Sequence, residues 1–522
     1  MRLPWSGLTP GSLIFYSVWS TWSVWSVCFI GGRLIPVVDL FAGPGGLNEG
    51  FTSVADGGLF RTAASFEMDP VACRTLRLRS ALRTVRASEG SFPSVYFDFM
   101  EGQVDFDSLV EHGSMSAAWK DAGDEVYNVE LGPDSHEVTE SAIERRLQTF
   151  DRRRDFVLLG GPPCQAYSLA GRSRRGKSAG FEADVKHFLF REYLHIIRQF
   201  RPAVFIMENV KGLLSSTHSR SESTGHRMFD LILSDMVQAG YEVRSLVVPG
   251  EPSSLAPSDY IIRSENFGVP QKRHRVILFG VREDRAHLTH DVLPAAAGPS
   301  VRHMIEGFPA LRSRLRPLGE DGAANWGRHR NQGASLAPGK RLGPVPDSWG
   351  SPFGAGGVRD VGDDMPARAW VRQERPRSAL QHEARGHMAT DIERYAYASK
   401  YALEFNVSPK LRHYPDRLLP NHKNARDKHV PFADRFRVQT WDQPSTTVVS
   451  HISKDGHYYI HPDPQQARSL TVREAARLQT FPDNYFFAGN RTEQYHQVGN
   501  AVPPFLARQI GEVVESFFSP DH

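Results

Sequence analysis

At residues 156–165 the sequence reads Phe-Val-Leu-Leu-Gly-Gly-Pro-Pro-Cys-Gln. Four apolar residues followed by two glycines predict a short buried strand that ends in a turn. Cys164 then lies just beyond the carboxyl end of this strand, where open α/β sheets bind ligands and carry out chemistry. A lone cysteine is more often a small buried hydrophobe. Further segments are therefore needed to give Cys164 a role.

Four other segments supply that context. They are Asp39-Leu40-Phe41-Ala42-Gly43-Pro44-Gly45-Gly46, Met207-Glu208-Asn209-Val210, Gln271-Lys272-Arg273-His274-Arg275 and Gln497-Val498-Gly499-Asn500-Ala501-Val502-Pro503-Pro504. In content and order, these segments and the cysteine segment resemble the DNA (cytosine-5) methyltransferase family, of the bacterial and phage restriction-modification type. The resemblance covers the chain from about Leu34 to the C-terminus.

From Leu34 onward, strand-like and helix-like segments alternate. The expected strands are 34–41, 61–67, 95–98, 156–160, 203–207, 241–248 and 276–281, and the expected helices are 45–54, 187–200 and 228–239. Such alternation predicts an α/β protein with a doubly wound, mostly parallel sheet. The resemblance implies the S-adenosylmethionine-dependent methyltransferase fold.

We expect two domains after an N-terminal extension. A catalytic and cofactor-binding domain spans 34–285, is completed by 496–522, and carries a polar surface insertion at 100–154 of unknown purpose. The remaining 286–495, where Gly, Pro and Arg replace clear periodicity, form a smaller domain. The resemblance implies that this domain holds the target-recognition region and faces the catalytic domain across a DNA-binding cleft.

The extension, residues 1–33, has no charged residue between Arg2 and Arg33. Its length would permit a membrane span, but Ser, Thr and Gly dilute it, and no small-residue cleavage site marks a signal peptide. Three explanations remain open: a start codon assigned too far upstream, a disordered or packing extension, and contact with a membrane.

Two helix signals stand near the C-terminus. Thr471-Val472-Arg473-Glu474 is a capping box that predicts a helix running to Gln479. Pro503-Pro504 predicts the start of the last helix, whose apolar stripe is Leu506, Ile510, Val513, Val514 and Phe517. We expect this stripe to dock on the sheet and to return Asn500 to the cofactor pocket.

Composition limits the partners. The net charge at pH 7 is only +3, so a DNA-binding surface must be local. The three cysteines, Cys28, Cys73 and Cys164, cannot form a disulfide framework, and no Cys/His cluster has zinc-ligand spacing. We therefore expect a metal-free site and a reducing, cytoplasmic location associated with the bacterial nucleoid.

The glycine-rich segment after the first strand predicts a ligand that approaches main-chain amides at a helix start. Glu67, at the end of the second strand, can accept both ribose hydroxyls of a nucleoside, and Asp98, expected at the end of the third, can take an adenine amino group. The resemblance implies that the cofactor is S-adenosyl-L-methionine. The full expected set is Phe41, Gly43, Gly45, Gly46, Glu67, Met68, Asp98, Phe99, Pro163, Leu189, Asn500 and Val502.

For the reaction, the Cys164 thiolate is expected to add to carbon 6 of cytosine, because carbon 5 is a poor nucleophile within the aromatic ring. Glu208 is expected to protonate or hydrogen-bond ring nitrogen 3. Arg275 matches the family arginine that holds the carbonyl at position 2, and Arg273 is expected to organise the site around it.

This geometry is not reachable inside a base stack, so the target cytosine must be extruded from duplex DNA. The loop after the nucleophile is expected to close over the DNA, with Gln165, Ser168 and Arg172 as its contacts. We expect a monomer that acts on double-stranded DNA and whose gene is paired with that of a restriction endonuclease. An orphan regulatory methylase would have the same sequence features.

The motifs bear on two other enzyme classes and on one class of inactive relative. Transfer-RNA cytosine methyltransferases carry a Cys-Phe-Thr signature in the small domain, and here no cysteine follows Cys164. Amino-group methyltransferases have Pro-Pro-Tyr or Pro-Pro-Trp where this chain has Pro-Pro-Cys. A catalytically inactive DNA-binding relative could dispense with the nucleophile or the acid, and both are intact here.

Overall fold

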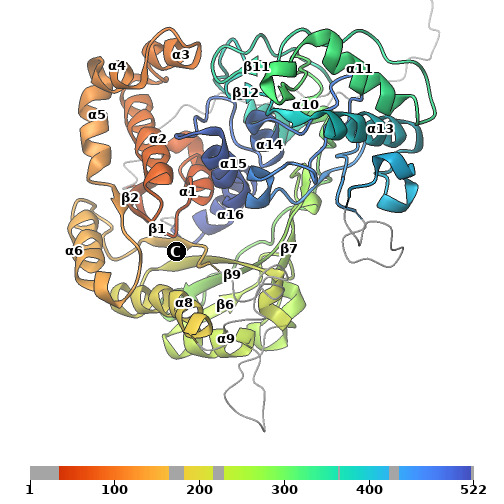
Figure 1. Ribbon diagram of the computed structural model, residues 1–522. Helices are drawn as coiled ribbons and strands as arrows, with labels where there is room; N and C mark the ends of the chain where they lie inside the picture. Colours follow the sequence, from red (N-terminus) through yellow and green to blue (C-terminus); the bar gives the residue numbers. More distant parts are fainter. Residues whose placement is uncertain (1–33, 164–180, 216–227, 363–364, 422–433, 519–522) are drawn as a thin grey trace, which may run out of the picture. The chain divides into compact units, whose positions relative to one another are not determined.

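A computed structural model of the chain describes residues 34–163, 181–215, 228–362, 365–421 and 434–518, with the side chains of helix α8 described from Leu189 onward. Its centre is one eight-stranded sheet of order β3-β2-β1-β4-β5-β9-β6, with β7 paired to β9 (Figure 1). The strands of this sheet are β1 Ile35–Leu40, β2 Phe60–Glu67, β3 Val126–Asn128, β4 Val157–Gly160, β5 Val204–Val210, β6 Tyr241–Arg244, β7 Ile261–Arg263 and β9 His274–Arg282.

The sheet is mostly parallel, as the sequence predicts. β3, β2, β1, β4 and β5 pair with their neighbours in parallel, whereas β9 runs antiparallel to both β5 and β6. All six residues of β1 are buried, the pattern of a strand that is covered on both faces.

Helices cover the two faces of the sheet (Figure 1). The helices are α1 Gly46–Phe51, α2 Pro70–Glu89, α3 Ser94–Met100, α4 Phe106–Glu111, α5 Gly113–Gly123, α6 His136–Leu147, α8 Phe181–Phe200, α9 Met228–Gln238, α10 Val301–Ile305, α11 Ala323–Ala334, α12 Pro366–Val371, α13 Ala389–Phe405, α14 Val472–Leu478, α15 Arg491–Asn500 and α16 Pro504–Glu515. α1 and α16 share one apolar core with the sheet, and α6, α8 and α9 share the other. None of the helices in the described ranges is long and apolar enough to cross a membrane.

The C-terminal helices follow the sequence prediction. The Thr471 hydroxyl accepts a hydrogen bond from the Glu474 amide, and the Glu474 carboxylate accepts one from the Thr471 amide at 2.8 Å. α16 begins at Pro504 and buries Leu506 and Ile510 in the core shared with β1. The capping box and the docked final helix are both confirmed.

The prediction of a strand at 95–98 is wrong. These residues belong to α3, which follows Pro93 and buries Val95, Tyr96, Phe99 and Met100 in a core with α2 and α5. Aromatic and β-branched residues favour strands only where a pleated surface is available to them, and here packing against two helices decides instead.

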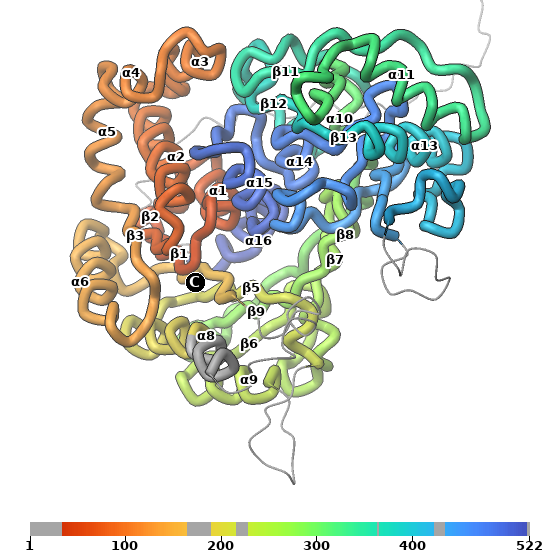
Figure 2. The backbone as a smooth tube through the Cα atoms, in the orientation of Figure 1, coloured from red at the N-terminus to blue at the C-terminus, as the bar shows by residue number. Residues whose placement is uncertain are grey.

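The third strand lies inside the stretch expected to be a surface insertion, 100–154. The chain passes from α2 through α3, α4 and α5 before β3 joins the edge of the sheet (Figure 2). β3 pairs with β2 in parallel, with Glu67 opposite Asn128. The insertion therefore completes the sheet and is not wholly an addition to its surface.

The described part of the 286–495 stretch has its own buried clusters around α10 to α15. Its short strands β10 Leu315–Arg316, β11 Gly350–Ser351, β12 His382–Glu383 and β13 His387–Met388 pair among themselves, and its β14 Ser445–Thr446 pairs with β8 Gln271–Lys272, which precedes the stretch. The buried Gln271 side chain donates hydrogen bonds to Leu478 O and Gln479 Oε1. Contacts link the chain from Leu34 onward into one compact unit, and the division into two domains stays a prediction.

Candidate active site

Three of the segments that carry predicted site residues leave the sheet at one edge. β1 lies between β2 and β4, so the order of strands reverses at β1. In open α/β sheets ligands bind beyond the carboxyl ends of the strands at such a reversal. The segments that leave β1, β2 and β4 there are the glycine loop, Glu67 and Pro162-Pro163.

Glu67 fixes the glycine loop. Its Oε2 accepts a hydrogen bond from the Gly43 amide at 2.8 Å, and its Oε1 accepts one from the Asp69 amide at 2.9 Å. Each carboxylate oxygen keeps a second lone pair that can accept a hydroxyl of a ligand. The carboxylate is therefore held in place by the main chain and can still accept hydrogen bonds.

Gly43 leaves room beside this carboxylate. Its φ is +56°, in the left-handed region that favours glycine, and a Cβ added there would meet no atom within 4 Å in the described part of the chain. Met68, next to Glu67, has a side chain that is 60% exposed. Open space beside main-chain amides, an accepting carboxylate and an exposed apolar side chain together fit a nucleoside cofactor.

Gly45 and Gly46 serve packing. A Cβ on Gly46 would lie 2.2 Å from Val502 O, and one on Gly45 would lie 2.7 Å from Leu76 Cδ2. Val502 itself is 8% exposed. These residues hold α1 against the segment before α16, and their contact with a cofactor stays a prediction.

Alanine substitutions at Gly43 and at Gly46 are expected to have different effects. Gly43→Ala is expected to raise the KM for a nucleoside cofactor about tenfold, because its Cβ enters the open space, while its positive φ costs about 1 kcal/mol of stability. Gly46→Ala is expected to lower stability by at least about 2 kcal/mol, because its Cβ meets main chain. Steady-state kinetics and thermal unfolding of both variants test this pair. Equal losses of stability with unchanged KM would contradict it.

The other expected cofactor residues are placed as follows. Phe41 is half-buried at φ +55° against the core of α6, α8 and α9, and Leu189 of α8 is also half-buried. Pro163 is exposed. Asn500 is exposed at the end of α15, with its Nδ2 3.3 Å from His496 Nδ1.

Asp98 and Phe99 do not lie at this edge as predicted, because the strand that was to carry them is a helix. Asp98 is half-buried within α3. Phe99 is 2% exposed, with its ring centroid 5.3 Å from that of Phe353 and 4.9 Å from that of Phe486. Phe99 is a core residue.

Asn128 occupies the strand end that was assigned to Asp98. It is the last residue of β3, and its Nδ2 donates to Glu67 O at 3.0 Å and to Met68 O at 2.9 Å. Its amide thus fixes the main chain that carries Glu67. A run of only three residues before Gly132-Pro133 gave too short a strand signal to be recognised.

Asp39, the last residue but one of β1, the strand before the glycine loop, was also missed. It is 1% exposed, and neither carboxylate oxygen has a hydrogen-bond partner among the residues that the structure describes. Burial, reinforced by the negative charge of Glu67, raises the pKa of Asp39 to about 7. A buried carboxyl without a partner is costly, and perturbed groups of this kind gather at functional sites. The signal was a carboxylate within an otherwise apolar strand.

Glu208 and Arg275 lie together. In the antiparallel pairing of β5 and β9, Val210 stands opposite Arg275. Arg275 Nε lies 2.7 Å from Glu208 Oε1, which makes an ion pair although the angles fall short of a hydrogen bond. The two side chains are 16% and 13% exposed, so both can still meet a ligand.

Arg273 is buried behind this pair. Its side chain donates to Val448 O at 2.8 Å and to Gly499 O at 3.4 Å, and its amide donates to the Ser264 hydroxyl. Burial and then the neighbouring Arg275 charge lower the pKa of Arg273 to about 9. Arg273 therefore ties β9 to the segments before and after α14, consistent with an organising role.

The beginning of the cysteine segment rests on Glu208 and Asn209. Asn209 Nδ2 donates to Pro162 O at 3.4 Å. A Cβ on Gly161 would lie 3.3 Å from Glu208 Oε2, so only glycine leaves that carboxylate undisturbed. Cys164, Gln165, Ser168 and Arg172 lie outside the described residues.

Comparison with known proteins gives one consistent answer. Residues 115–311 and 372–516 match the family model of C-5 cytosine-specific DNA methylases. Type II methyltransferase M.Bpa9945I of Bacillus paralicheniformis is 32% identical over 93% of this chain and 100% of its own length. Type II methyltransferase M1.HphI of Haemophilus parahaemolyticus is 24% identical over 91% of this chain and 86% of its own length.

Among solved structures, that of the Entamoeba histolytica methyltransferase EhMeth is 12% identical to this chain. It covers 93% of this chain and 98% of its own, with a TM-score of 0.43. The family model and the type II relatives are matches of sequence, separate from this structural likeness.

Proposed function

The chain belongs to the C-5 cytosine-specific DNA methylase family, within the type II methyltransferases, and we propose that it extrudes a cytosine from duplex DNA and methylates carbon 5 through a covalent Cys164 adduct. The single observation that carries the proposal is the Glu208–Arg275 pair at 2.7 Å, set directly behind the start of the cysteine segment. A carboxyl and a guanidinium side by side match the nitrogen and carbonyl edge of a cytosine.

In the proposed reaction, the Cys164 thiolate forms a bond to carbon 6, and the electrons of the 5,6 double bond move toward carbon 5. Glu208 supplies a proton or a hydrogen bond to ring nitrogen 3, which limits the negative charge that this attack creates. Carbon 5 then takes the methyl group, with the donor sulfonium released as a neutral thioether, and loses its proton to water, so that the double bond re-forms and the thiolate leaves.

Arg275 is proposed to donate to the carbonyl oxygen at position 2 when the cytosine arrives. Its guanidinium Nη1 already donates to His274 O at 3.0 Å, which fixes the plane of the group. Arg273, held by Val448 O and Gly499 O, keeps β9 in position and adds positive charge nearby. A free thiol is only a few per cent ionised near neutral pH, so positive charge near Cys164 favours the reactive form.

Family membership implies S-adenosyl-L-methionine as the methyl donor. When bound, it supplies an electrophilic methyl group on a sulfonium. We propose that Glu67 accepts its ribose hydroxyls and that the open space beside Gly43 admits the rest of the molecule. Asn128 and not Asp98 stands at the end of β3, and we place Phe41 and Met68 on either side of the adenine.

We further propose that Gln165, Ser168 and Arg172 contact the DNA while the cytosine is extruded at a cost of about a few kcal/mol. Sequence recognition is proposed to reside in the 286–495 stretch. The protein is proposed to act as a monomer near the bacterial nucleoid. We also propose that it protects DNA from a restriction endonuclease that cuts the same target sequence.

The test is transfer of tritiated methyl from S-adenosylmethionine to duplex DNA and, separately, to transfer RNA, followed by bisulfite sequencing of the DNA. We expect label in DNA only, at cytosines within one short sequence. Label in transfer RNA alone, or no label from a folded protein that binds the cofactor, would overturn the proposal.

Glu208→Gln is expected to lower kcat by about 10²–10⁴-fold, because the amide cannot transfer a proton. The KM for S-adenosylmethionine is expected to stay unchanged. A matched control is Glu242→Gln, which removes another carboxylate–arginine pair of the same sheet, Glu242 with Arg244. Equal losses in the two variants would give Glu208 a purely structural role.

A further inference from the structure

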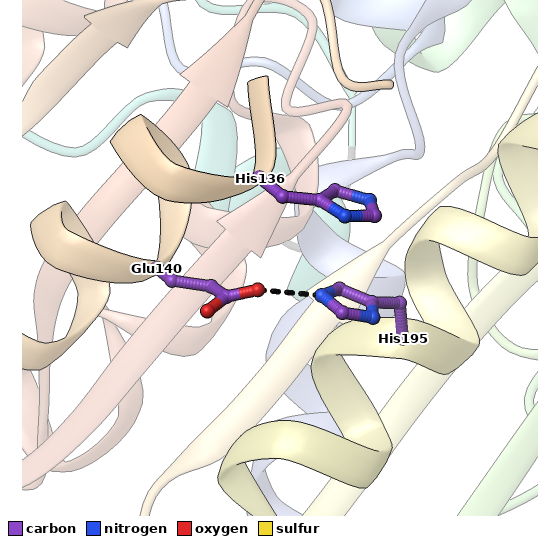
Figure 3. A group of neighbouring side chains, drawn as sticks. All are labelled: His136, Glu140 and His195. Carbon is purple, nitrogen blue, oxygen red and sulfur yellow. Dashed lines mark hydrogen bonds and ion pairs between the residues drawn. The ribbon is translucent and has the colours of Figure 1, made fainter. Parts of the chain in front are cut away.

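Helices α6 and α8, which share a core that does not include α1 and α16, bring two histidines and two glutamates together. Figure 3 shows three of them, His136, Glu140 and His195. His195 Nε2 lies 2.6 Å from Glu140 Oε1, and His136 Nε2 lies 2.6 Å from Glu192 Oε2. The two imidazole rings stack with centroids 4.0 Å apart and planes 5° from parallel. Ligand atoms of His136, Glu140 and His195 all lie within 4.8 Å of one another.

The packing of the two helices creates this juxtaposition. Ile143 and Leu147 of α6 enter the same core as Tyr193 and Ile197 of α8. With these residues turned inward, His136 and Glu140, four residues apart on α6, meet Glu192 and His195 of α8, which are three residues apart, where the two helices pack together. The cluster is thus held by two helices whose apolar faces are buried in one core.

Two histidine–carboxylate hydrogen bonds are the simplest account of the cluster. Two imidazolium rings 4.0 Å apart would repel each other. Because the ring planes are only 5° from parallel, one ring must turn before nitrogens of both rings can point at a single ion. A neutral imidazole offers one N–H and one lone pair. When His136 Nε2–H donates to Glu192, the lone pair of His136 Nδ1 remains free for another partner.

We propose that His136, Glu140 and His195 bind a divalent zinc ion, with Glu192 orienting His136. His195 Nε2 and one Glu140 oxygen are two of its ligands, and His136 Nδ1 is the third. Ligands at about 2.0–2.2 Å from a tetrahedral ion are roughly 3.3 Å apart. The 2.6 Å pair of His195 and Glu140 therefore needs to open by less than about 1 Å, and the His136 nitrogen, within 4.8 Å of the other two ligand atoms, needs to turn toward them.

The donor set selects the metal. Two imidazole nitrogens and one carboxylate oxygen suit zinc, whereas Mg²⁺ and Ca²⁺ prefer oxygen ligands alone. The His136, Glu140 and His195 side chains are about one third exposed, so water can take the fourth position. Glu192 is only 7% exposed and accepts from the other nitrogen of His136, the usual arrangement that orients a ligating histidine.

Such an ion would act on the fold and not on methyl transfer. It would join α6, which leads into β4, to α8, which leads into β5. β4 and β5 carry the start of the cysteine segment and Glu208. Zinc bound to the folded state alone raises stability in proportion to the logarithm of its concentration.

The experiment uses the full-length protein, stripped with a chelator and then titrated with ZnCl₂. We expect about one zinc per chain after dialysis by mass spectrometric metal analysis, and a rise in Tm of about 5 °C at saturating zinc. Co²⁺ in place of zinc is expected to give the visible absorption of a tetrahedral site.

Glu140→Gln is expected to weaken zinc binding at least tenfold, because it removes the negative ligand while a hydrogen bond to His195 remains possible. The matched control is Glu144→Gln, an exposed position one turn further along α6, which should bind zinc like the wild type. Magnesium chloride should leave Tm unchanged. Absence of bound zinc in the stripped and reloaded wild type, or equal binding by the Glu140→Gln variant, would overturn the proposal.

Discussion

Replacement of Cys164 by serine is expected to lower methyl transfer to DNA by at least about 10⁴-fold, the scale on which removing a covalent nucleophile acts in other enzymes. A serine hydroxyl is far less acidic than a thiol, so almost none of it is ionised at neutral pH and attack at carbon 6 fails. Single-turnover incorporation of tritiated methyl into a DNA duplex measures the effect. Binding of S-adenosylmethionine should persist, because the expected cofactor contacts do not include this thiol.

Cys73→Ser is the matched control for the nucleophile. Burial, followed by the Glu67 charge, raises the pKa of the Cys73 thiol to about 12, so this cysteine is not a thiolate. Its Sγ donates to Glu67 O at 3.3 Å, which a serine hydroxyl can also do. Normal turnover by Cys164→Ser, or equal losses in the two variants, would refute the covalent mechanism.

Glu474→Gln is expected to lower the free energy of unfolding by about 3–5 kcal/mol. Arg468 Nη1 and Nη2 each lie 2.8 Å from a Glu474 oxygen, and both side chains are 0% exposed. Glutamine can still take part in the capping box with Thr471, but it leaves the Arg468 charge buried without its counter-charge. Urea unfolding of the variant and the wild type measures the difference.

A second capping box supplies the control. Glu493 accepts from the Asn490 amide at 2.7 Å in an exposed setting, without a buried arginine. Glu493→Gln is therefore expected to cost less than about 1 kcal/mol. A similar loss in both variants would show that the cap and not the buried charge pair dominates. Unfolding of the Glu474→Gln variant within error of the wild type would contradict the prediction outright.

The surroundings of Glu474 also predict sensitivity to acid. Burial alone would raise the pKa of Glu474, but Arg468 and His461 hold it well below its usual range. Burial lowers the pKa of His382 and of His461 to about 4. The unfolded chain therefore binds more protons than the folded one between pH 4 and 6.5, and stability is lost as pH falls through that window. The same urea titrations repeated at pH 5 and pH 7.5 would detect this loss.

Much of the fold and site could be predicted because the signals are local. β1, β2, β4 and β5 are runs of apolar residues that end in turn residues or acids, and each lies within a few residues of its expected position. Glu208 and Arg275 were expected to act on one base, and the pairing of β5 with β9 brings them to 2.7 Å. The capping box at Thr471 needs only four consecutive residues and is present as predicted.

The predictions of secondary structure were wrong for segments whose packing or pairing partner the sequence does not reveal. Ser94–Met100 has the composition of a strand, but α2 and α5 offer it a core in which only a helix buries Tyr96 and Phe99 on one side. Val126–Asn128 is too short to be recognised alone, and it is a strand because β2 offers it an edge to pair with. Asp98 was consequently given the place that Asn128 occupies.

The sequence by itself determined the family and the alternation of strands and helices, because motif order and short-range periodicity are properties of the chain alone; the chemistry of Cys164 and Glu208 stays a proposal from the same motifs. Only the tertiary structure decided that Asp39 is a buried acid without a hydrogen-bond partner in the described residues, that Asn128 stands beside Glu67, and that His136 and His195 stack. These features depend on residues far apart in sequence, such as the 55 positions between Glu140 and His195. Burial and proximity across such separations arise only when the apolar faces of the elements have packed together.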